Sequence, residues 1–554
     1  MNKLNDILSV IDGYIGGSNW FVFLLLGTGI FFTVYLRFPQ FRYMRYAVSI
    51  VRGKFDRASD RGDTTHFQAL ATALSGTVGT GNIAGVALAI HLGGPAALFW
   101  MLVTALVGMT TKFVEVTLSH KYREITADGT VSGGPMYFLR DRLKMRWLAV
   151  IFAAATVLSA FGTGSLPQIN SIANSVYASF GINKALTGAI LAIVLGFVVI
   201  GGIKRIAKVT SHLVPFMAML YFIGSIVVLA CNYRNIVPSL LSIFTDVFTG
   251  TAAVGGFIGS GFSFAFNRGV NRGLFSNEAG QGSAPIAHAS ARAHEPVSEG
   301  LVALLEPFID TVIICMLTGL TILASGVWHE KVDNRFQRTD MLILERHITE
   351  ADATEMFHSN SLPLFTGQLE FGNGVMTAPH TIIHSRSVAE NVRAYTVGNV
   401  PYSGTVTVNR GAIVGHEHVY FQGQSLIHSA PLTNAAFTKS LFGKFGGIIV
   451  TACLLLFAFS TTIAWSYYGD RAIVFLFGLK GKLWFHILFV IFFFLASFVD
   501  TTIVWTLSGI AVALMTIPNL LGLLMLHKEM KSEVRKFWKE YAARFPDEKT
   551  FKDL

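Results

Sequence analysis

Charged residues and cysteine are both scarce in this sequence. Asp, Glu, Lys and Arg make up 14% of the 554 residues, whereas a soluble domain carries about 25%. Hydrophobic residues reach 52%, and the mean hydropathy is +0.53. The three cysteines all fall in apolar runs, so they do not indicate a disulfide framework. The composition therefore excludes an ordinary soluble domain and indicates a membrane protein.

Signatures of processing and of nucleotide chemistry are also missing. The first 18 residues show no basic stretch, apolar core and small-residue cleavage site in succession, so no removable signal peptide is predicted. No GxxxxGK[S/T] loop is present, which argues against a built-in ATPase. The run Gly79-x-Gly81-x-x-Ala84 matches a dinucleotide fingerprint, but it lies inside an apolar run instead of following a strand. With no metal-ligand cluster or nucleophile–base pair in the apolar segments, the chain is predicted not to be an enzyme.

Eleven apolar segments approach the length of about 20 residues that spans a bilayer. They lie at residues 19–38, 67–92, 94–118, 147–170, 184–202, 211–231, 255–290, 305–328, 446–468, 483–499 and 501–527. The pattern predicts an all-α polytopic membrane protein with 11 transmembrane helices. One helix precedes two sets of five, and an odd number of spans inverts the second set relative to the first.

Lys and Arg concentrate in alternate loops, and this bias sets the orientation of membrane proteins. Short loops on the sparse side hold only Lys3, Lys184 and Arg234. The basic loops hold Arg42, Arg45, Arg52, Lys54, Arg57, Arg61, Lys121, Arg123, Arg140, Arg142, Lys144, Arg146, Lys204, Arg205 and Lys208, and the basic tail at 528–554 adds Lys528, Lys531, Arg535, Lys536 and Lys539. We expect a bacterial inner-membrane protein with its N-terminus outside and its C-terminus cytoplasmic. The net charge of +10 is therefore a topology signal, and no nucleic-acid partner is predicted.

Residues 329–442 interrupt the apolar pattern between two segments of the core, 1–328 and 443–527. Strand-like runs such as Thr405–Val408 alternate here with turn signals at 372–374 and 409–411. We predict a small β-rich extracytoplasmic insert. His416 and His418 would share a face if both lay on a strand, so they could hold a metal. The pattern favours the simpler interpretation that they are exposed histidines of a solvated domain.

Two apolar segments contain too many glycines for simple helices. Residues 75–85 read SGTVGTGNIAG, with four glycines within ten residues, and residues 273–283 read GLFSNEAGQGS. Each glycine disfavours helix by about 1 kcal/mol, and unpaired backbone is not tolerated in lipid. These segments are therefore either close contacts between helices packed through small residues or unwound stretches that line a binding site.

The positions of the two segments favour the binding site, because each opens one set of five spans. Broken helices at matching places in inverted halves are typical of transporter sites near the membrane midplane. Their half-helix N-termini attract a carboxylate, and their freed carbonyls coordinate a cation. The pattern predicts a secondary transporter for a zwitterionic solute and Na⁺. A channel, and a sensor that binds its ligand in the insert, remain as alternatives.

Three motifs resemble the alanine or glycine:cation symporter family, which includes the sodium:alanine symporters. They are residues 75–85, the run GLFSNEAGQGSAPIA at 273–287 and the run FAFSTTIAWSYYG at 457–469. The resemblance covers all eleven spans, and the insert departs from the short loop that is usual there. It implies the leucine-transporter-type fold of one helix plus a five-plus-five inverted repeat, sodium-coupled symport of alanine or glycine, and no organic cofactor. Nothing in the sequence specifies an oligomeric state.

The resemblance also implies roles for individual residues. The sodium ligands would be the carbonyls of Ser75 and Val78 and the hydroxyls of Ser460 and Thr461. Hard oxygen ligands of this kind suit Na⁺. Alternatively, the two hydroxyls bond back to the preceding turn of their own helix.

The substrate site implied by the family involves both broken segments. The residues concerned are Thr80, Gly81 and Asn82 for the carboxylate, Phe275, Ser276 and Asn277 for the ammonium group, and Gln168 and Trp465 as further pocket residues. Gln168 has the alternative of an interhelical hydrogen bond, and Trp465 that of simple packing. A bulky indole beside glycines favours a small substrate. We expect Glu278 to brace its broken helix, although a coupled proton or a cation site would also use a buried carboxylate.

Overall fold

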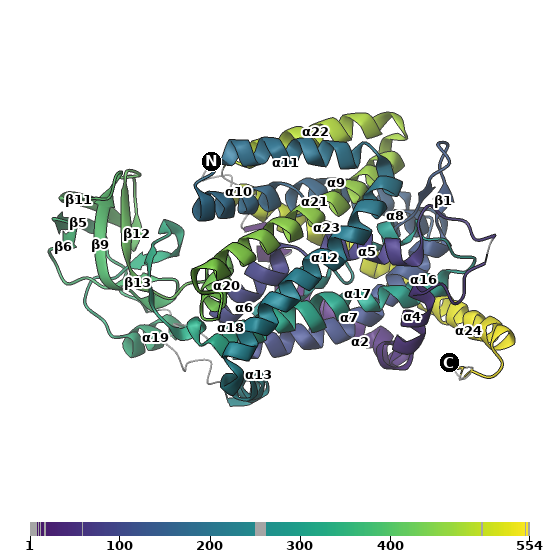
Figure 1. The fold of residues 1–554 in the computed structure, drawn as a ribbon, viewed down its shortest axis with the longest axis horizontal. Helices are drawn as coiled ribbons and strands as arrows, with labels where there is room; N and C mark the ends of the chain where they lie inside the picture. Colours follow the sequence, from purple (N-terminus) through teal and green to yellow (C-terminus); the bar gives the residue numbers. More distant parts are fainter. Residues whose placement is uncertain are drawn as a thin grey trace.

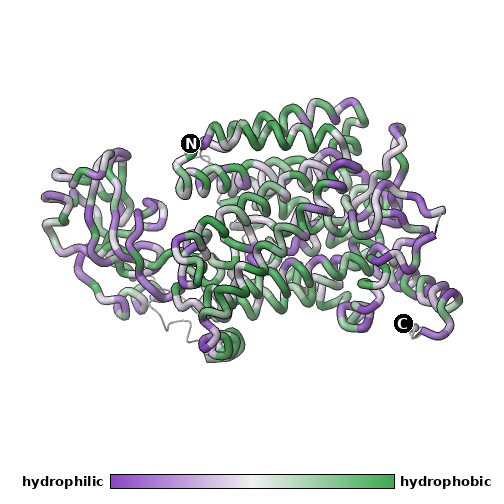
Figure 2. Tube along the Cα trace, viewed as in Figure 1, coloured by the Kyte–Doolittle hydropathy of each residue, from purple (hydrophilic) through white to green (hydrophobic). Residues whose placement is uncertain are grey.

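The computed structural model describes residues 18–57, 59–249, 262–359, 361–499, 502–548, 550 and 551, together with 8, 10, 11 and 13–15. Figure 1 shows a long bundle of helices, with most of the strands gathered beyond one end and α24 (His527–Arg544) at the other. Figure 2 shows hydrophobic residues along the bundle and hydrophilic residues at both ends. This distribution is that of a multi-pass membrane protein, because only the middle of the bundle can face lipid.

The helices of the first half follow the predicted segments closely. They are α2 (Asn19–Tyr35), α3 (Pro39–Arg42), α4 (Met44–Val51), α5 (His66–Thr77), η1 (Gly81–Gly85), α6 (Val86–Gly93), α7 (Ala96–Lys121), α8 (Pro135–Asp141), α9 (Arg146–Gly162), α10 (Leu166–Phe180), α11 (Lys184–Val199), α12 (Gly202–Cys231), η2 (Tyr233–Asn235) and α13 (Ile236–Thr249). A short hairpin of β1 (Glu124–Ile125) and β2 (Val131–Ser132) follows α7.

The helices of the second half are more fragmented. They are α14 (Phe262–Asn277), α15 (Ala284–His288), α16 (Pro296–Ala303), α17 (Leu305–Pro307), η4 (Phe308–Cys315), α18 (Met316–Ser325), η5 (Val327–His329), α20 (Ser429–Thr438), η7 (Gly443–Phe445), α21 (Gly446–Phe477), α22 (Lys480–Ala496), α23 (Thr502–Met525) and α24. Residues 255–261 of the predicted seventh span, residue 501 of the last, and residues 549 and 552–554 of the predicted tail lie outside the described residues.

Six helices within the described ranges are long and apolar enough to cross a membrane, and the bent pair of α5 with η1–α6 makes a seventh. Helices α2 and α11 are apolar but shorter. The polytopic helical fold is thus as predicted, while the count of 11 spans stays a prediction. The predicted fourth span differs in detail, because it is divided at Thr163–Ser165 between α9 and α10.

The insert is β-rich, as predicted. Its elements are β3 (Val332–Arg335), η6 (Arg338–Asp340), β4 (Met341–Ile343), α19 (Glu350–His358), β5 (Gly367–Gly372), β6 (Val375–Met376), β7 (Ile382–His384), β8 (Ser387–Val388), β9 (Glu390–Thr396), β10 (Val400–Pro401), β11 (Gly404–Asn409), β12 (Ala412–Ile413) and β13 (Val419–Ser425). The larger antiparallel sheet runs β12-β11-β5-β6-β9-β13-β3, with β10 paired to β9, and the smaller runs β4-β7-β8.

Alternating side chains of the larger sheet form the core of the insert. Val406 pairs in register with Leu369 on the neighbouring strand, and both are buried with Phe371 and Phe421. This alternation is what a sheet with one covered face requires. Residues 429–438, which fall inside the predicted insert, instead form α20, and this helix packs against the membrane core.

The histidine pair of the insert is not placed as a strand pair. His416 adopts a left-handed backbone conformation (φ 54°), and β13 begins only at Val419. The expectation that His416 and His418 share a strand face is therefore wrong. Among the residues described here, no group of three His, Cys, Asp or Glu side chains is arranged to hold a metal ion.

Both glycine-rich segments break their helices. The first helix, α5, ends at Thr77, Val78 is extended, and the chain continues through the π-helix η1 with a bend of 53°. The second, α14, ends at Asn277, and Glu278 has a left-handed conformation (φ 54°) before α15 begins. Helix α5 packs against α12, α21 and α15, and α14 packs against α7. The two breaks therefore lie inside the bundle, where protein instead of lipid surrounds them.

Candidate functional site between two broken helices

The four predicted sodium ligands lie together where α5 crosses α21. The Ser75 hydroxyl donates to the Ser460 carbonyl (2.6 Å), and Ser460 Oγ lies 3.4 Å from the Ser75 carbonyl oxygen. Thr461 Oγ1 lies 3.4 Å from the Val78 carbonyl oxygen. All four residues are buried. The structure thus brings two carbonyls and two hydroxyls, all hard oxygens, into two neighbouring contacts between the end of α5 and α21.

The alternative role of the two hydroxyls is also present. Ser460 and Thr461 each donate to the Phe457 carbonyl of their own helix, at 2.8 Å and 3.1 Å. These bonds are shorter than the 3.4 Å contacts to α5, which are longer than a typical hydrogen bond. A hydroxyl that donates to its own helix keeps its lone pairs, so its oxygen can still face a cation. The two interpretations are therefore compatible.

The glycines of the first break fall into two classes. A Cβ at Gly79 would lie 2.5 Å from Thr461 Oγ1, and one at Gly76 would lie 2.7 Å from the Tyr468 hydroxyl. These two positions require glycine because α5 approaches α21 closely. A Cβ at Gly81 would meet Phe275 at an ordinary 3.7 Å, and one at Gly85 would meet nothing within 4 Å. Helix packing therefore explains why glycine stands at positions 76 and 79, but it does not explain Gly81 and Gly85.

Asn82 connects the first break to the second through a carboxylate. Its side-chain oxygen accepts from the Gly79 backbone N–H (2.8 Å), and its Nδ2 donates to Asp310 Oδ1 (2.6 Å). Ser276, on the last turn of α14, donates to Asp310 Oδ2 (2.8 Å). Thr311 donates to the same oxygen (2.7 Å). One buried aspartate therefore holds a residue of each broken helix in place.

Asp310 is a residue that our sequence reasoning missed. It lies on η4, a π-helical stretch within the predicted span 305–328, and π-helical turns are frequent at functional sites. The available signal was the presence of Glu306 and Asp310 in an apolar run, because a carboxylate at membrane depth is costly unless it has a role. The backbone N–H of Asn82, predicted to face the substrate carboxylate, instead donates to the Gly79 carbonyl (3.3 Å).

The second break is held by its own side chains and by α21. Asn277 Oδ1 accepts from the Ala279 backbone N–H (3.0 Å). Glu278 accepts from Trp465 Nε1 (3.1 Å) and from the Ser283 hydroxyl (2.5 Å). Glu278 therefore ties the break to α21, an arrangement that fits the predicted bracing role. The Asn277 side-chain N–H groups are buried without a partner among the described residues.

Gln168 and Trp465 lie at the third backbone break, between α9 and α10. Gln168 Nε2 donates to the Thr163 carbonyl (3.0 Å), while its Oε1 is buried with no partner in the described part of the chain. Trp465 packs so closely on Gly164 that this position has no room for a Cβ. The structure therefore groups Gln168 with Trp465, and separately groups Gly81 and Asn82 with Phe275 and Ser276. The link between the two groups is the segment 276–278.

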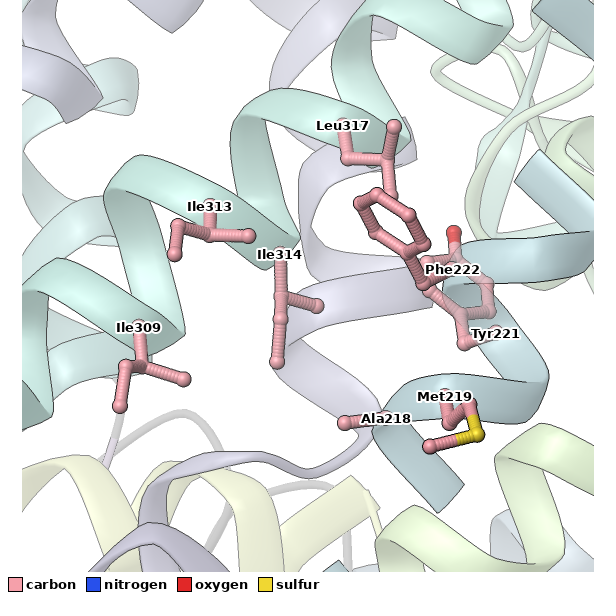
Figure 3. A pocket seen from close by; sticks show the side chains of 8 residues that line it. All are labelled: Ala218, Met219, Tyr221, Phe222, Ile309, Ile313, Ile314 and Leu317. Atoms are coloured by element: carbon pink, nitrogen blue, oxygen red, sulfur yellow. The ribbon is translucent and has the colours of Figure 1, made fainter. Parts of the chain in front are cut away.

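An apolar cavity of about 220 Å³ lies beside η4, but it does not suit a zwitterion. Figure 3 shows its side chains, which are hydrocarbon apart from the Tyr221 hydroxyl and the Met219 sulfur. Ile309 and Ile313 of η4 line it, whereas Asp310 between them bonds to Asn82 and Ser276. With Met219 and Phe222 exposed on the bundle surface, this cavity faces the lipid side of η4.

Comparison with known proteins places the chain among transporters. The model of the sodium:alanine symporter family matches residues 1–409 and 405–552. The sodium/alanine symporter AgcS of Methanococcus maripaludis is 35% identical over 536 residues, covering 96% of this chain and 97% of that protein. An uncharacterized transporter of Haemophilus influenzae is 34% identical over 536 residues, covering 97% and 96%. The crystal structure of MhsT in complex with L-phenylalanine is similar with a TM-score of 0.49 and 12% identity, covering 84% of this chain and 89% of that one.

Proposed function

Because this chain belongs to the sodium:alanine symporter family, we propose that it carries a small neutral amino acid, alanine or glycine, into the cell together with Na⁺. Members of this family are secondary transporters and not enzymes, and the matches support a cation-coupled amino-acid symporter in a multi-pass membrane fold. The identity of the ion and that of the amino acid are the finer parts of the proposal, and they depend on the two sites described above.

The observation that carries the sodium proposal is the oxygen cluster at the crossing of α5 and α21. Val78 leaves the helical conformation (φ −79°, ψ 90°), so its carbonyl turns out of the helix. The hydroxyls of Ser460 and Thr461 face this carbonyl and that of Ser75. Four uncharged oxygens at the end of a broken helix are ligands that Na⁺ accepts and that a proton does not need.

The amino-acid proposal is supported by the buried polar groups that the two breaks bring together. Gly81 lies against Phe275, and Asn82 and Ser276 bind the same carboxylate of Asp310. Backbone N–H groups at Thr80 and Gly81 would bind the substrate carboxylate, and oxygens around Phe275 and Ser276 would bind its ammonium group. Trp465 is fully buried between Glu278 and Gly164, and a bulky indole beside a glycine favours a substrate with a small side chain.

Alternating access accounts for the site better than a channel does. The polar residues of both breaks, Thr80, Asn82, Ser276, Asn277 and Glu278, are buried, whereas a channel needs a continuous polar path. The proposal also includes the predicted five-plus-five inverted repeat, the inner-membrane location, and a topology with the N-terminus and insert outside and the C-terminus in the cytoplasm. Helix α24 and the insert lie at opposite ends of the bundle (Figure 1), as this topology requires.

The test is uptake of labelled alanine into proteoliposomes that contain the purified protein. We expect uptake driven by an inward Na⁺ gradient and little uptake in K⁺ buffer. Thr461→Val should raise the Na⁺ concentration for half-maximal uptake about tenfold, the effect of losing about 1.4 kcal/mol of ligand binding. Thr462→Val is the matched control, because within the described residues Thr462 bonds only to the Ala458 carbonyl of its own helix (3.2 Å). Equal uptake in K⁺ buffer, or equal effects of the two variants, would contradict the sodium proposal.

A further inference from the structure

A line of buried ionisable side chains leads from one end of the bundle to the second break. It begins at Asp56, whose side chain is 45% exposed at the end predicted to face the cytoplasm. His66 Nε2 lies 3.1 Å from Asp56 Oδ1, and His66 Nδ1 donates to Glu299 Oε2. Glu299 Oε1 accepts from His288 Nδ1 (2.5 Å). His288 Nε2 lies 3.6 Å from Glu306 Oε2. Carboxyl and imidazole groups therefore alternate through the five residues of this line, in the order Asp56, His66, Glu299, His288 and Glu306.

The line continues to the backbone of the second break. Glu306 Oε1 accepts from Lys112 Nζ (3.1 Å), which also lies 3.8 Å from Glu115 Oε1. Glu115 Oε2 accepts from Asn519 Nδ2 (2.8 Å), and the same amide nitrogen donates to the Gly280 carbonyl (2.9 Å). Gly280 is two residues from Glu278. The line thus connects an exposed carboxylate to the backbone break that holds part of the proposed substrate site.

Both broken helices contribute to this line through a histidine. His66 is the first residue of α5, and His288 is the last residue of α15. Glu299, on α16, accepts a hydrogen bond from each of them. Any relative movement of α5 and α15 during transport therefore changes the distances along the line.

The hydrogen-bond chemistry requires protons that can change place. An ionised carboxylate only accepts hydrogen bonds, and a neutral imidazole carries a single N–H. His66 faces a carboxyl oxygen with both ring nitrogens, and His288 would do the same if its 3.6 Å separation from Glu306 closed. An imidazole in this position must carry a second proton, or one of its neighbouring carboxyl groups must be protonated. Both arrangements use the same atoms and differ only by the shift of a proton along a hydrogen bond.

A charge count of the buried groups, made together with Glu278, whose charge acts on Lys112, shows capacity for one more proton. If both imidazoles are protonated, they and Lys112 supply three positive charges. Glu115, Glu278, Glu299 and Glu306 supply four negative charges, and all of these side chains are buried. An uncompensated buried charge costs several kcal/mol, so an additional proton stabilises the group whenever no other cation is near. Other ionisable groups near the line are His120, Arg123, Asp310 and Tyr468.

We propose that this line is a proton relay, through which the buried carboxylates at the second break exchange one proton with the cytoplasm in each transport cycle. A proton enters at Asp56, and at every step one O–H or N–H bond breaks as the next N–H or O–H bond forms. The terminal acceptor is the carboxylate of Glu115, which is reached through Lys112: the ammonium group gives one N–H proton to Glu115 and takes one from Glu306. When Na⁺ and the amino acid bind, the proton returns to the cytoplasm by the reverse steps. This inference rests on the proposed function and orientation.

Two links of the relay are open in this conformation. The separations of 3.6 Å between His288 and Glu306 and of 3.8 Å between Lys112 and Glu115 exceed hydrogen-bond length. His288 Nε2, Glu306 Oε2 and Glu115 Oε1 are buried and have no hydrogen-bond partner within the described residues. A small movement of α15 would close the first of these links, because His288 lies on that helix. Proton exchange is therefore tied to the position of the second broken helix.

The first experiment measures protons released on ligand binding, independently of transport. Calorimetric titration of the purified protein with NaCl plus saturating alanine is repeated at one pH in two buffers of different ionisation heat. We expect the wild type to release up to one proton and Glu299→Gln to release none. Glu124→Gln is the control, since Glu124 is exposed at the same end and pairs with Arg140 outside the line. A heat that does not depend on the buffer in the wild type would overturn the relay.

The second experiment measures uptake at fixed external pH while the internal pH of the proteoliposomes is varied. For one proton, the rate should change by up to about tenfold per pH unit. Asp56→Asn, at a position whose side chain is 45% exposed, should reduce this dependence, and Glu299→Gln should remove it. If Glu299 is only a structural latch, its variant will lower uptake equally at every internal pH, and the relay is refuted. Failure of Na⁺-driven uptake with intact proton release would instead refute the proposed function alone.

Discussion

Asp310 provides the sharpest test of how the two broken helices are held together. Its carboxylate accepts hydrogen bonds from Asn82 on the first break (2.6 Å) and from Ser276 beside the second (2.8 Å). A hydrogen bond to a charged group contributes about 1.5–3 kcal/mol. Asp310→Ala removes both acceptors, a gross loss of about 3–6 kcal/mol, and it leaves the Asn82 amide without its closest partner. Allowing for relaxation of the two donors, we expect an effect near the lower end of this range.

The assay is the kcat/KM of Na⁺-driven alanine uptake, corrected for the amount of folded protein recovered by size-exclusion chromatography. A loss of about 3 kcal/mol corresponds to roughly a 100-fold fall, because about 1.4 kcal/mol is tenfold. Thr311→Val is the matched control, since Thr311 bonds to the same carboxylate (2.7 Å) but belongs to neither break. The Thr311→Val variant should lower the kcat/KM of uptake a few-fold at most. If folded Asp310→Ala protein transports within about threefold of the wild type, the carboxylate does not position the site and the reasoning fails.

The remaining predictions concern helix packing, the insert and pH. Gly79→Ala should impair Na⁺-driven uptake strongly, because its Cβ would lie 2.5 Å from Thr461 Oγ1. Gly85→Ala should be tolerated, because its Cβ would meet nothing within 4 Å. Similar uptake by the two variants would show that the contact between position 79 and Thr461 is unimportant. Replacing residues 331–427 by a short linker should preserve uptake, and removing residues 331–438 should abolish it, since Thr433 of α20 donates to the Ile83 carbonyl in the first break (3.2 Å). Burial lowers the pKa of His384 to about 4, so between about pH 6.5 and about pH 4 only the unfolded insert binds this proton, and its free energy of unfolding should fall by roughly 2 kcal/mol as the pH drops. Hydrogen exchange in β9 and β13, corrected for its intrinsic pH dependence, would measure this, and an unchanged profile in His384→Gln would assign the effect to another group.

The sequence was sufficient to predict features that depend on local composition. Runs of glycine at membrane depth predicted both helix breaks, and alternation with turn residues predicted the β-rich insert. The structure also brings Ser75, Val78, Ser460 and Thr461 together, as the family resemblance implied, although their role as ligands stays a prediction. The signals for the breaks and for the insert lie in residues that are adjacent along the chain, whereas the grouping of the four oxygens came from the family resemblance.

Features that depend on contacts between distant segments were not predictable in this way. The pairing of Asp310 with Asn82 joins positions 228 residues apart. The line from Asp56 to Glu306 draws on the loop before α5 and on α5, α15, α16 and α17. A single sequence shows that Glu306 and Asp310 are costly in an apolar span, but not which donors satisfy them. The break at Thr163–Ser165 was missed because one glycine between polar residues is weak against a long apolar run. The sequence did not predict that α20 belongs to the membrane core, because this short segment lies between polar residues and was therefore counted with the insert.

The amide side chains at the breaks perform a structural task that determines what is left for the substrate. Lipid-embedded backbone must be satisfied internally, and a side-chain amide does this at each break. Asn82 accepts from the Gly79 N–H, Asn277 accepts from the Ala279 N–H, and Gln168 donates to the Thr163 carbonyl. Each amide therefore uses one of its two ends on the backbone. Because Asn277 retains donors and Gln168 retains an acceptor, both buried and without a described partner, Asn277 is better suited to the substrate carboxylate and Gln168 to its ammonium group. This reverses the direction in which the family resemblance oriented Asn277.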